Sequence, residues 1–142
     1  MKIENILATK GAKVLTVHSS QTVKEVVTLL ARHRIGALVV VDDTGRLAGI
    51  ISERDVIREA AQHDDVLARP VSAAMTQSVV TGSPHDDVRS VLRTMTERRF
   101  RHLPILDRGE LIGVISIGDM VKAQLDEDEG EIETLQTQIT KG

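Results

Sequence analysis

Cysteine, tryptophan and tyrosine are absent from this chain of 142 residues, and Phe100 is its single aromatic residue. The absence of cysteine excludes disulfides and thiolate metal sites and fits a reducing compartment, so we expect a cytoplasmic protein. The lack of aromatic rings removes the stacking platforms used in single-stranded nucleic-acid binding, and we expect no nucleic-acid partner. No stretch is long and apolar enough to span a membrane, and a signal peptide's basic start and apolar run are missing.

The sequence also lacks the patterns that catalysis and metal binding require. His18, His33, His63 and His85 have no mutual spacing that would bind a metal. No phosphate-binding glycine loop, Ser–His–Asp order or paired-carboxylate arrangement stands out. We therefore predict no catalytic residue, no metal and no catalytic cofactor, and an enzyme that processes a nucleotide is the less favoured alternative.

The net charge of −3 is unevenly distributed along the chain. Residues 126–133 hold six acids, whereas residues 1–125 hold 15 acidic and 17 basic residues. A slightly basic body is compatible with a phosphorylated ligand, and equally with an ordinary solvated surface.

The most informative feature is an internal repeat. Residues 14–58 and 79–122 match at an offset of 65, which becomes 64 after one residue is lost in a turn. Matched pairs include Thr16/Thr81, Val26/Val91, Arg34/Arg99, Leu38/Leu103, Gly49/Gly113, Ser52/Ser116 and Asp55/Asp119. Such a repeat indicates two copies of one supersecondary unit, neither able to bury its apolar face alone. A ligand is then expected in the cleft between the copies.

Each repeat predicts the element order β-α-β-β-α. In the first copy we expect a short strand at 14–17, a helix at 22–33, strands at 37–41 and 47–51, and a helix from Ser52 to about 61. In the second we expect a strand at 79–81, a helix over the apolar stripe at 88–95, strands at 103–106 and 111–115, and a helix from Ser116. The predicted fold class is α/β (α+β), with two pseudo-twofold-related units and a C-terminal helix.

The chain divides into four predicted segments. Residues 1–61 form the first unit with its N-terminal segment, 62–71 a linker, 72–124 the second unit, and 125–142 an acidic tail. Ile132, Leu135 and Ile139 in the tail form a thin helical stripe. We interpret it as a C-terminal helix that needs a partner surface, with a frayed tail as the alternative.

Both repeats contain one motif where the last strand meets the last helix. It reads Gly49-Ile50-Ile51-Ser52-Glu53-Arg54-Asp55 in the first copy and Gly113-Val114-Ile115-Ser116-Ile117-Gly118-Asp119 in the second. Ser-x-x-Asp is a helix capping box, so a purely structural role is one interpretation. The other is ligand binding, because an Asp at this junction can accept two hydrogen bonds from a ribose diol while free helix N–H groups attract phosphate. The glycine before each serine indicates close approach of backbone or ligand.

These features resemble those of the CBS domain, named from cystathionine beta-synthase. The resemblance rests on the repeated unit, the two motif ends and the stretch Arg99-Phe100-Arg101-His102-Leu103-Pro104-Ile105, and it covers about residues 5–124. It implies a tandem pair, called a Bateman module, of the stand-alone bacterial signal-transduction type. Such pairs bind adenosine-containing ligands: AMP, ADP, ATP, NAD or S-adenosylmethionine.

The resemblance also implies the binding residues of two sites. At the first, Asp55 would hold the ribose hydroxyls, Ser52 stands at the helix start and Arg54 would contact phosphate. The base would be surrounded by Thr76, Thr81 and the backbone of Phe100, Arg101 and His102. The second site would consist of Asp119 and Ser116 with Lys10, Thr16 and the backbone of Ile35, Gly36 and Ala37.

The two sites differ in sequence. Gly118 stands where the first site has Arg54, so a phosphate ligand is missing at that position. Gly36-Ala37 stands where the first site has Arg101-His102, which leaves more room and fewer hydrogen-bond donors. We expect the sites to prefer different ligands, or one to stay empty. Arg98, Arg99 and Arg101 form a basic cluster after a helix, for which phosphate contact and a solvated helix end are both open.

From the resemblance we expect a regulatory module that senses an adenine nucleotide in the cleft between the repeats. AMP is the first candidate ligand, ahead of ATP, ADP and NAD. It also implies a homodimer, with the helices after Ser52 and Ser116 at the interface, and an effector protein that reads the change. A constitutive dimeric scaffold, in which the motif only caps helices, is the alternative.

Overall fold

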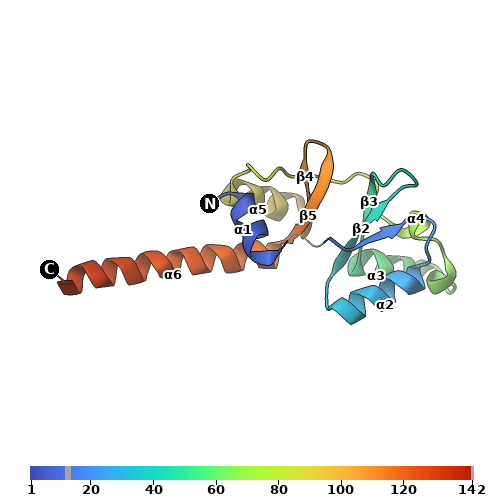
Figure 1. Cartoon of the computed structure of the whole chain (residues 1–142). Coiled ribbons are helices and arrows are strands. Elements are labelled where there is room, and N and C mark those ends of the chain that lie inside the picture. The colour runs from blue at the N-terminus through green and yellow to red at the C-terminus, as the bar shows by residue number, and fades with distance from the viewer. Residues whose placement is uncertain (12–13, 142) are drawn as a thin grey trace.

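The computed structural model describes residues 1–11 and 14–141, with side chains described as far as residue 130. The elements are α1 (Ile3–Lys10), β1 (Thr16–His18), α2 (Val23–His33), β2 (Ala37–Val41), β3 (Leu47–Ser52), α3 (Glu53–Gln62), η1 (Val66–Ala68), α4 (Val71–Ala74), α5 (Val88–Arg98), β4 (His102–Asp107), β5 (Glu110–Ser116) and α6 (Ile117–Lys141). They form two lobes, one around β2 and β3 and the other around β4 and β5 (Figure 1). This confirms the predicted fold class.

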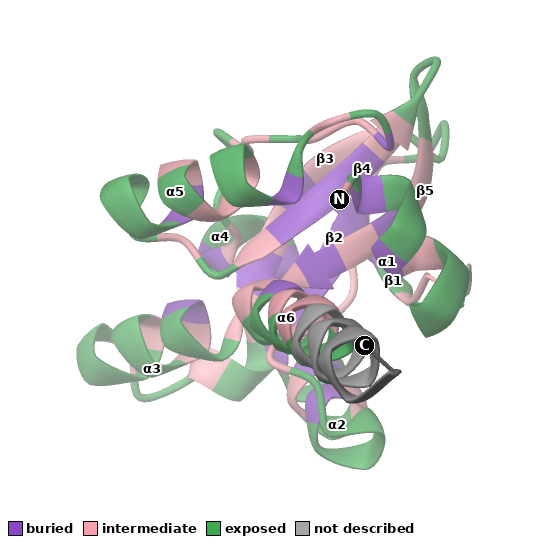
Figure 2. Cartoon of the chain, turned by 90° about the vertical axis from the view of Figure 1, so that its left-hand side faces the viewer, coloured by how far each residue is buried: buried purple, intermediate pink, exposed green. Residues whose placement is uncertain are grey.

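The first lobe is a three-stranded sheet covered by helices. β1 pairs in parallel with β2, which pairs in antiparallel fashion with β3. The parallel pair is connected through α2, because parallel strands need a crossover, whereas the five residues 42–46 between β2 and β3 allow only a hairpin. The apolar run of β2 is buried at four of its five residues, and Figure 2 shows the strands as the buried centre of the molecule.

The second lobe departs from the repeat at its first strand. The predicted strand at 79–81 is wrong, because these residues form no strand and only the next residue, Gly82, makes one isolated parallel bridge, to Ile105. The Gly82 N–H donates to the Pro104 carbonyl at 2.9 Å, and the Leu106 N–H donates to the Gly82 carbonyl at 2.9 Å. Glycine weakens a strand and Pro84 lacks an N–H, so pairing stops after this bridge and the second sheet has two strands, β4 and β5.

The two hydrophobic cores exchange their leading segments. α1 packs in the core of the second lobe, where Ile3 and Ile6 are buried. Val71 and Ala74 of α4, which precede the second repeat (79–122) in sequence, are buried in the core of the first lobe. Each lobe is therefore completed by a segment that lies next to the other repeat along the chain.

The helix that closes the second unit and the predicted C-terminal helix are one continuous helix, α6, which extends away from both lobes (Figure 1). The side chains of Ile132, Leu135 and Ile139 lie outside the described residues, so their predicted stripe stays a prediction. In the described part of the chain, no helix combines the length and apolarity needed to cross a bilayer.

Candidate functional site

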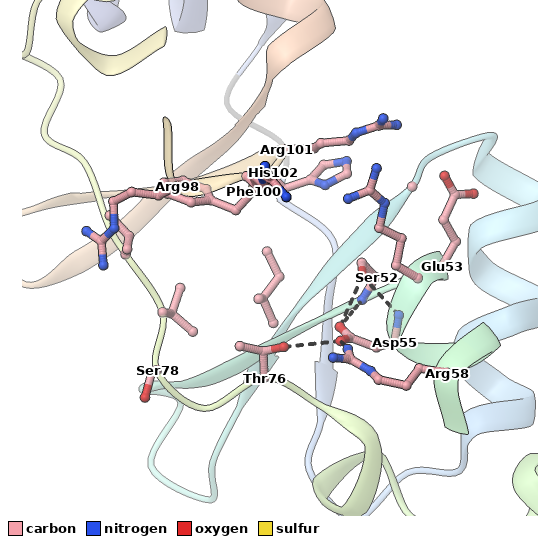
Figure 3. A pocket seen from close by; sticks show the side chains of 16 residues that line it. Ser52, Glu53, Asp55, Arg58, Thr76, Ser78, Arg98, Phe100, Arg101 and His102 are labelled. Carbon is pink, nitrogen blue, oxygen red and sulfur yellow. Dashed lines mark hydrogen bonds and ion pairs between the residues drawn. The ribbon is translucent and has the colours of Figure 1, made fainter. Parts of the chain in front are cut away.

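A cleft of about 570 Å³ lies between the two lobes. One wall comes from the end of β3 and the start of α3, and the other from the end of α5 and the start of β4 (Figure 3). Its lining residues are Gly36, Ile50, Ser52, Glu53, Arg54, Asp55, Arg58, Thr76, Ser78, Val79, Val80, Arg98, Arg99, Phe100, Arg101 and His102. The Asp55 motif thus faces the basic cluster of the other repeat across the cleft, which we call the Asp55 cleft.

Asp55 is held in the first wall by four groups. Its Oδ2 accepts from the Ser52 backbone N–H at 2.8 Å and from Ser52 Oγ at 3.1 Å. Its Oδ1 accepts from Thr76 Oγ1 at 3.1 Å and from the Arg58 guanidinium, as Figure 3 shows. Among the described residues, Asp55 is the only charged side chain that is buried, with 3% of its surface exposed. A buried carboxylate needs such partners, because desolvation alone would oppose its charge.

The motif therefore caps α3 as the structural interpretation predicted. The Asp55 N–H donates to Ser52 Oγ at 3.2 Å, which completes a capping box with the Ser52 N–H bond to the carboxylate. The same pair of bonds joins Ser116 and Asp119 at 2.9 and 3.0 Å. Capping accounts for Ser52 and Ser116, but not for the cleft that Asp55 lines.

The glycine of each motif is explained by close packing within the chain. A Cβ on Gly49 would lie 2.7 Å from the Thr76 carbonyl oxygen, and a Cβ on Gly113 would lie 2.5 Å from Leu7 Cδ2. Ile50 and Thr76 exchange two backbone hydrogen bonds, of 3.0 and 2.8 Å, beside Gly49. Because Gly49 has no side chain, the Thr76 backbone can pack against β3, and this places Thr76 Oγ1 within hydrogen-bonding distance of Asp55.

The opposite wall is basic and carries one half-buried histidine, His102. Burial lowers the pKa of His102 below its ordinary value of 6.5, although the nearby carboxylates of Glu53 and Asp119 partly oppose this effect. His102 is therefore neutral at neutral pH and adds a polar surface without charge. The positive charge of this wall comes from its arginines, of which Figure 3 shows Arg98 and Arg101 on either side of Phe100 and His102.

Asp119 is engaged by a lysine from the first helix. Lys10 Nζ donates to Asp119 Oδ2 at 2.6 Å and to the Val114 carbonyl at 2.7 Å. Burial raises the pKa of Asp119, but the Lys10 ion pair and the hydrogen bonds from Ser116 outweigh it, so the pKa lies below 3.8. Lys10 and Asp119 line a groove between α1 and α6 that also holds Lys122, Asp126 and Glu127.

The structure brings together most of the predicted first site. Ser52, Arg54, Asp55, Thr76, Phe100, Arg101 and His102 all line the Asp55 cleft. Thr81 lies elsewhere, in a smaller cavity beside α5.

The predicted second site is less assembled. Lys10 meets Asp119, but Thr16, Ile35 and Ala37 are not among the residues that line their groove. Gly36 lines the Asp55 cleft instead, where a Cβ would lie 3.1 Å from His102 Nε2.

Sequence reasoning missed Arg58 and Glu53 and did not assign Arg98 and Arg99 to the site. Arg58 could have been found from its spacing, since residues three apart lie on one helix face and Arg58 follows Asp55 by three. Arg98 and Arg99 were recognised as a cluster, but only the docking of the lobes puts them opposite Asp55. In the described residues, no three His, Asp or Glu side chains gather into a metal-binding group.

Comparisons with known proteins agree with this architecture. The sequence model of the CBS domain matches the chain twice, at residues 3–62 and 71–126. The CBS domain-containing protein YhcV of Bacillus subtilis is 32% identical over 124 residues, which cover 87% of each chain.

Two solved structures illustrate the similarity. The CBS-domain containing protein ATU1752 from Agrobacterium tumefaciens is 40% identical with a TM-score of 0.83, covering 87% of this chain and 92% of its own. The CBS domain pair of protein MJ0100 was crystallised in complex with 5′-methylthioadenosine and S-adenosyl-L-methionine. It is 25% identical with a TM-score of 0.77, covering 87% of this chain and 98% of its own.

Proposed function

The chain belongs to the CBS-domain family as a tandem pair, and on this premise we propose that it is a regulatory module whose Asp55 cleft binds an adenosine-containing ligand. The observation that carries the proposal is the position of Asp55, a buried carboxylate on one wall of a cleft of about 570 Å³ between two lobes. The complex of MJ0100 with two adenosine derivatives supports the ligand class.

Binding of a ribose diol requires a local exchange of partners. Both oxygens of Asp55 already accept hydrogen bonds within the chain, so the diol must replace one of these donors. Arg58 is the group that can leave, because its side chain is 61% exposed and reaches the carboxylate from the helix surface. Once released, its guanidinium becomes available to a phosphate of the same ligand.

The ligand would transmit its presence by bridging the lobes. Asp55 and Arg58 belong to the first lobe, and Phe100, Arg101 and His102 to the second. A molecule that contacts both walls binds best to one relative arrangement and shifts the population toward it. A ligand that bound both arrangements equally would transmit nothing, and a partner protein would read the shift.

The test is thermal unfolding of the full chain with AMP, ADP, ATP, NAD, NADH and S-adenosylmethionine. A ligand present at about 100 times its dissociation constant is expected to stabilise the fold by roughly 2.7 kcal/mol. If no adenosine derivative raises the melting temperature, the proposal fails and the scaffold interpretation remains. Analysis of each nucleotide after incubation separates binding from turnover, because a module without catalysis returns it unchanged.

We also propose that two copies pair through α3 and α6. The described residues include three large apolar side chains on these helices that face solvent: Ile57, Val121 and Leu125, with exposed fractions of 68%, 40% and 56%. Ile57 and Val121 occupy equivalent positions of the repeat, so the two lobes present a pseudo-symmetric apolar surface. A second copy related by twofold symmetry would bury both at once.

Light scattering after gel filtration tests this pairing. The native chain is expected to elute with twice the mass of one chain, and the double variant Ile57→Glu, Val121→Glu with the mass of one, because charge cannot be buried there unpaired. Leu67→Glu is the matched control, since Leu67 is an apolar side chain of similar exposure, 47%, that lies on η1 and belongs to neither helix. A monomeric native chain, or a control that dissociates equally, would disprove this interface.

A further inference from the structure

The Asp55 cleft contains more positive charge than its own carboxylates balance. Five arginines line it, which are Arg54, Arg58, Arg98, Arg99 and Arg101, against the two carboxylates of Glu53 and Asp55. The cleft therefore has an excess of three positive charges. Arg58 pairs with Asp55, but the other four arginines form no ion pair with any side chain in the described ranges 1–11 and 14–130.

This charge is specific to the Asp55 cleft and not a consequence of the repeat. The residues equivalent to Arg98, Arg99 and Arg101 are His33, Arg34 and Gly36, and Gly118 is equivalent to Arg54. One guanidinium in the first unit thus corresponds to three in the second. The arginines also come from both walls, since Arg54 and Arg58 lie on α3 whereas Arg98 ends α5.

Like charges that face each other across a cleft repel, and the repulsion is stronger where little water screens it. An anion placed between the walls converts this repulsion into attraction to both. Guanidinium groups suit phosphate in particular, because their planar fork donates two parallel hydrogen bonds to its oxygens. A chain of two or three phosphates offers more charged oxygens to the arginines of both walls than a single phosphate does.

Resting on the proposed function, we propose that the ligand of the Asp55 cleft is a nucleoside polyphosphate, with two or three phosphates extending from Asp55 to the arginines of the second lobe. The cleft then selects against the ligands of MJ0100. S-adenosylmethionine carries a sulfonium cation, which the arginines repel, and methylthioadenosine is uncharged. AMP offers one phosphate, so it binds more weakly than ADP, and ADP more weakly than ATP.

The experiment measures dissociation constants by calorimetry for adenosine, AMP, ADP, ATP, S-adenosylmethionine and inorganic tripolyphosphate on the full chain at one fixed ionic strength. ATP is expected to bind at least about tenfold more tightly than AMP, since each charge-assisted hydrogen bond gained is worth about a factor of ten. The double variant Arg98→Gln, Arg101→Gln is expected to weaken ATP binding by roughly 100-fold and adenosine binding by less than about threefold.

Arg93→Gln is the matched control, because Arg93 lies on the same helix but outside the lining of the cleft. It is expected to leave every affinity unchanged, which separates contact at the cleft from the overall charge of the protein. Unchanged adenosine binding in the double variant shows that the fold is intact.

The outcomes distinguish this inference from the function on which it rests. If adenosine derivatives bind but AMP or S-adenosylmethionine matches ATP, the polyphosphate inference is overturned and the adenosine site stands. Equal weakening of ATP by the control variant also overturns it. If nothing containing adenosine binds while tripolyphosphate alone does, both the adenosine site and the nucleoside part of this inference fail.

Discussion

Asp55→Asn is expected to remove nearly all of the stabilisation that the best nucleotide gives to the native chain. The carboxylate offers two charged acceptors to a ribose diol, whereas an amide offers one neutral acceptor and a donor that the diol does not need. Loss of one or two charge-assisted hydrogen bonds corresponds to a roughly 100-fold weaker affinity. At a ligand concentration that stabilises the native chain by about 2.7 kcal/mol, the variant would then gain only about 0.4 kcal/mol. Thermal unfolding with and without ligand measures both values.

Asp119→Asn is the matched control for this prediction. Asp119 holds the same position in the second repeat and makes the same bonds with Ser116, but its carboxylate is engaged by Lys10. Both variants weaken one helix cap, so their ligand-free melting temperatures should fall by similar amounts. A response to nucleotide that survives in Asp55→Asn, or disappears equally in Asp119→Asn, would show that Asp55 only caps its helix.

Ile115→Ala is expected to destabilise the whole chain by about 2–5 kcal/mol, the usual cost of emptying a fully buried aliphatic site. Ile115 is 0% exposed in the core of the second lobe. Ile51 is its equivalent in the first lobe and is also 0% exposed, so Ile51→Ala should cost a similar amount. Chemical denaturation followed by circular dichroism measures both changes.

Either variant is expected to unfold in a single transition at lower denaturant. α1 completes the second core and α4 the first, so neither lobe keeps its full core when the other unfolds. Leu67→Ala, at a half-exposed position outside both cores, should change stability by less than about 0.5 kcal/mol. Two separate transitions in Ile115→Ala, with only one of them shifted, would contradict the exchange of core segments.

Periodicity predicted the elements that a local pattern dictates. The stripe at Val23, Val26 and Leu30 gave α2, and these three side chains are buried. The branched apolar run from Ala37 to Val41 gave β2. Duplication strengthened these predictions, because each pattern occurs twice, and repetition also misled once. Thr81 resembles Thr16, yet Gly82 and Pro84 limit the second copy to one bridge.

The N-terminal helix was not predicted, since α1 has a weak apolar stripe and its helicity depends on packing. Ile3 and Ile6 are buried by the second lobe, which lies more than 80 residues away in sequence. Lys10 reaches Asp119 for the same reason. Local patterns carry no information about such partners, because the contact exists only after the chain has folded back on itself.

The sequence alone determined that this protein has two copies of one unit, that a carboxylate follows each last strand, and that only the first copy adds an arginine to that motif. These properties depend only on the spacing or the position of residues along the chain, so each can be recognised from short segments of the sequence. Only the tertiary structure decided that Asp55 is buried, that Arg58 holds it, and that Arg98 and Arg101 face it across a cleft. The physical reason is that burial and local charge depend on all residues that surround a site in space, and here these residues come together only when the two lobes dock.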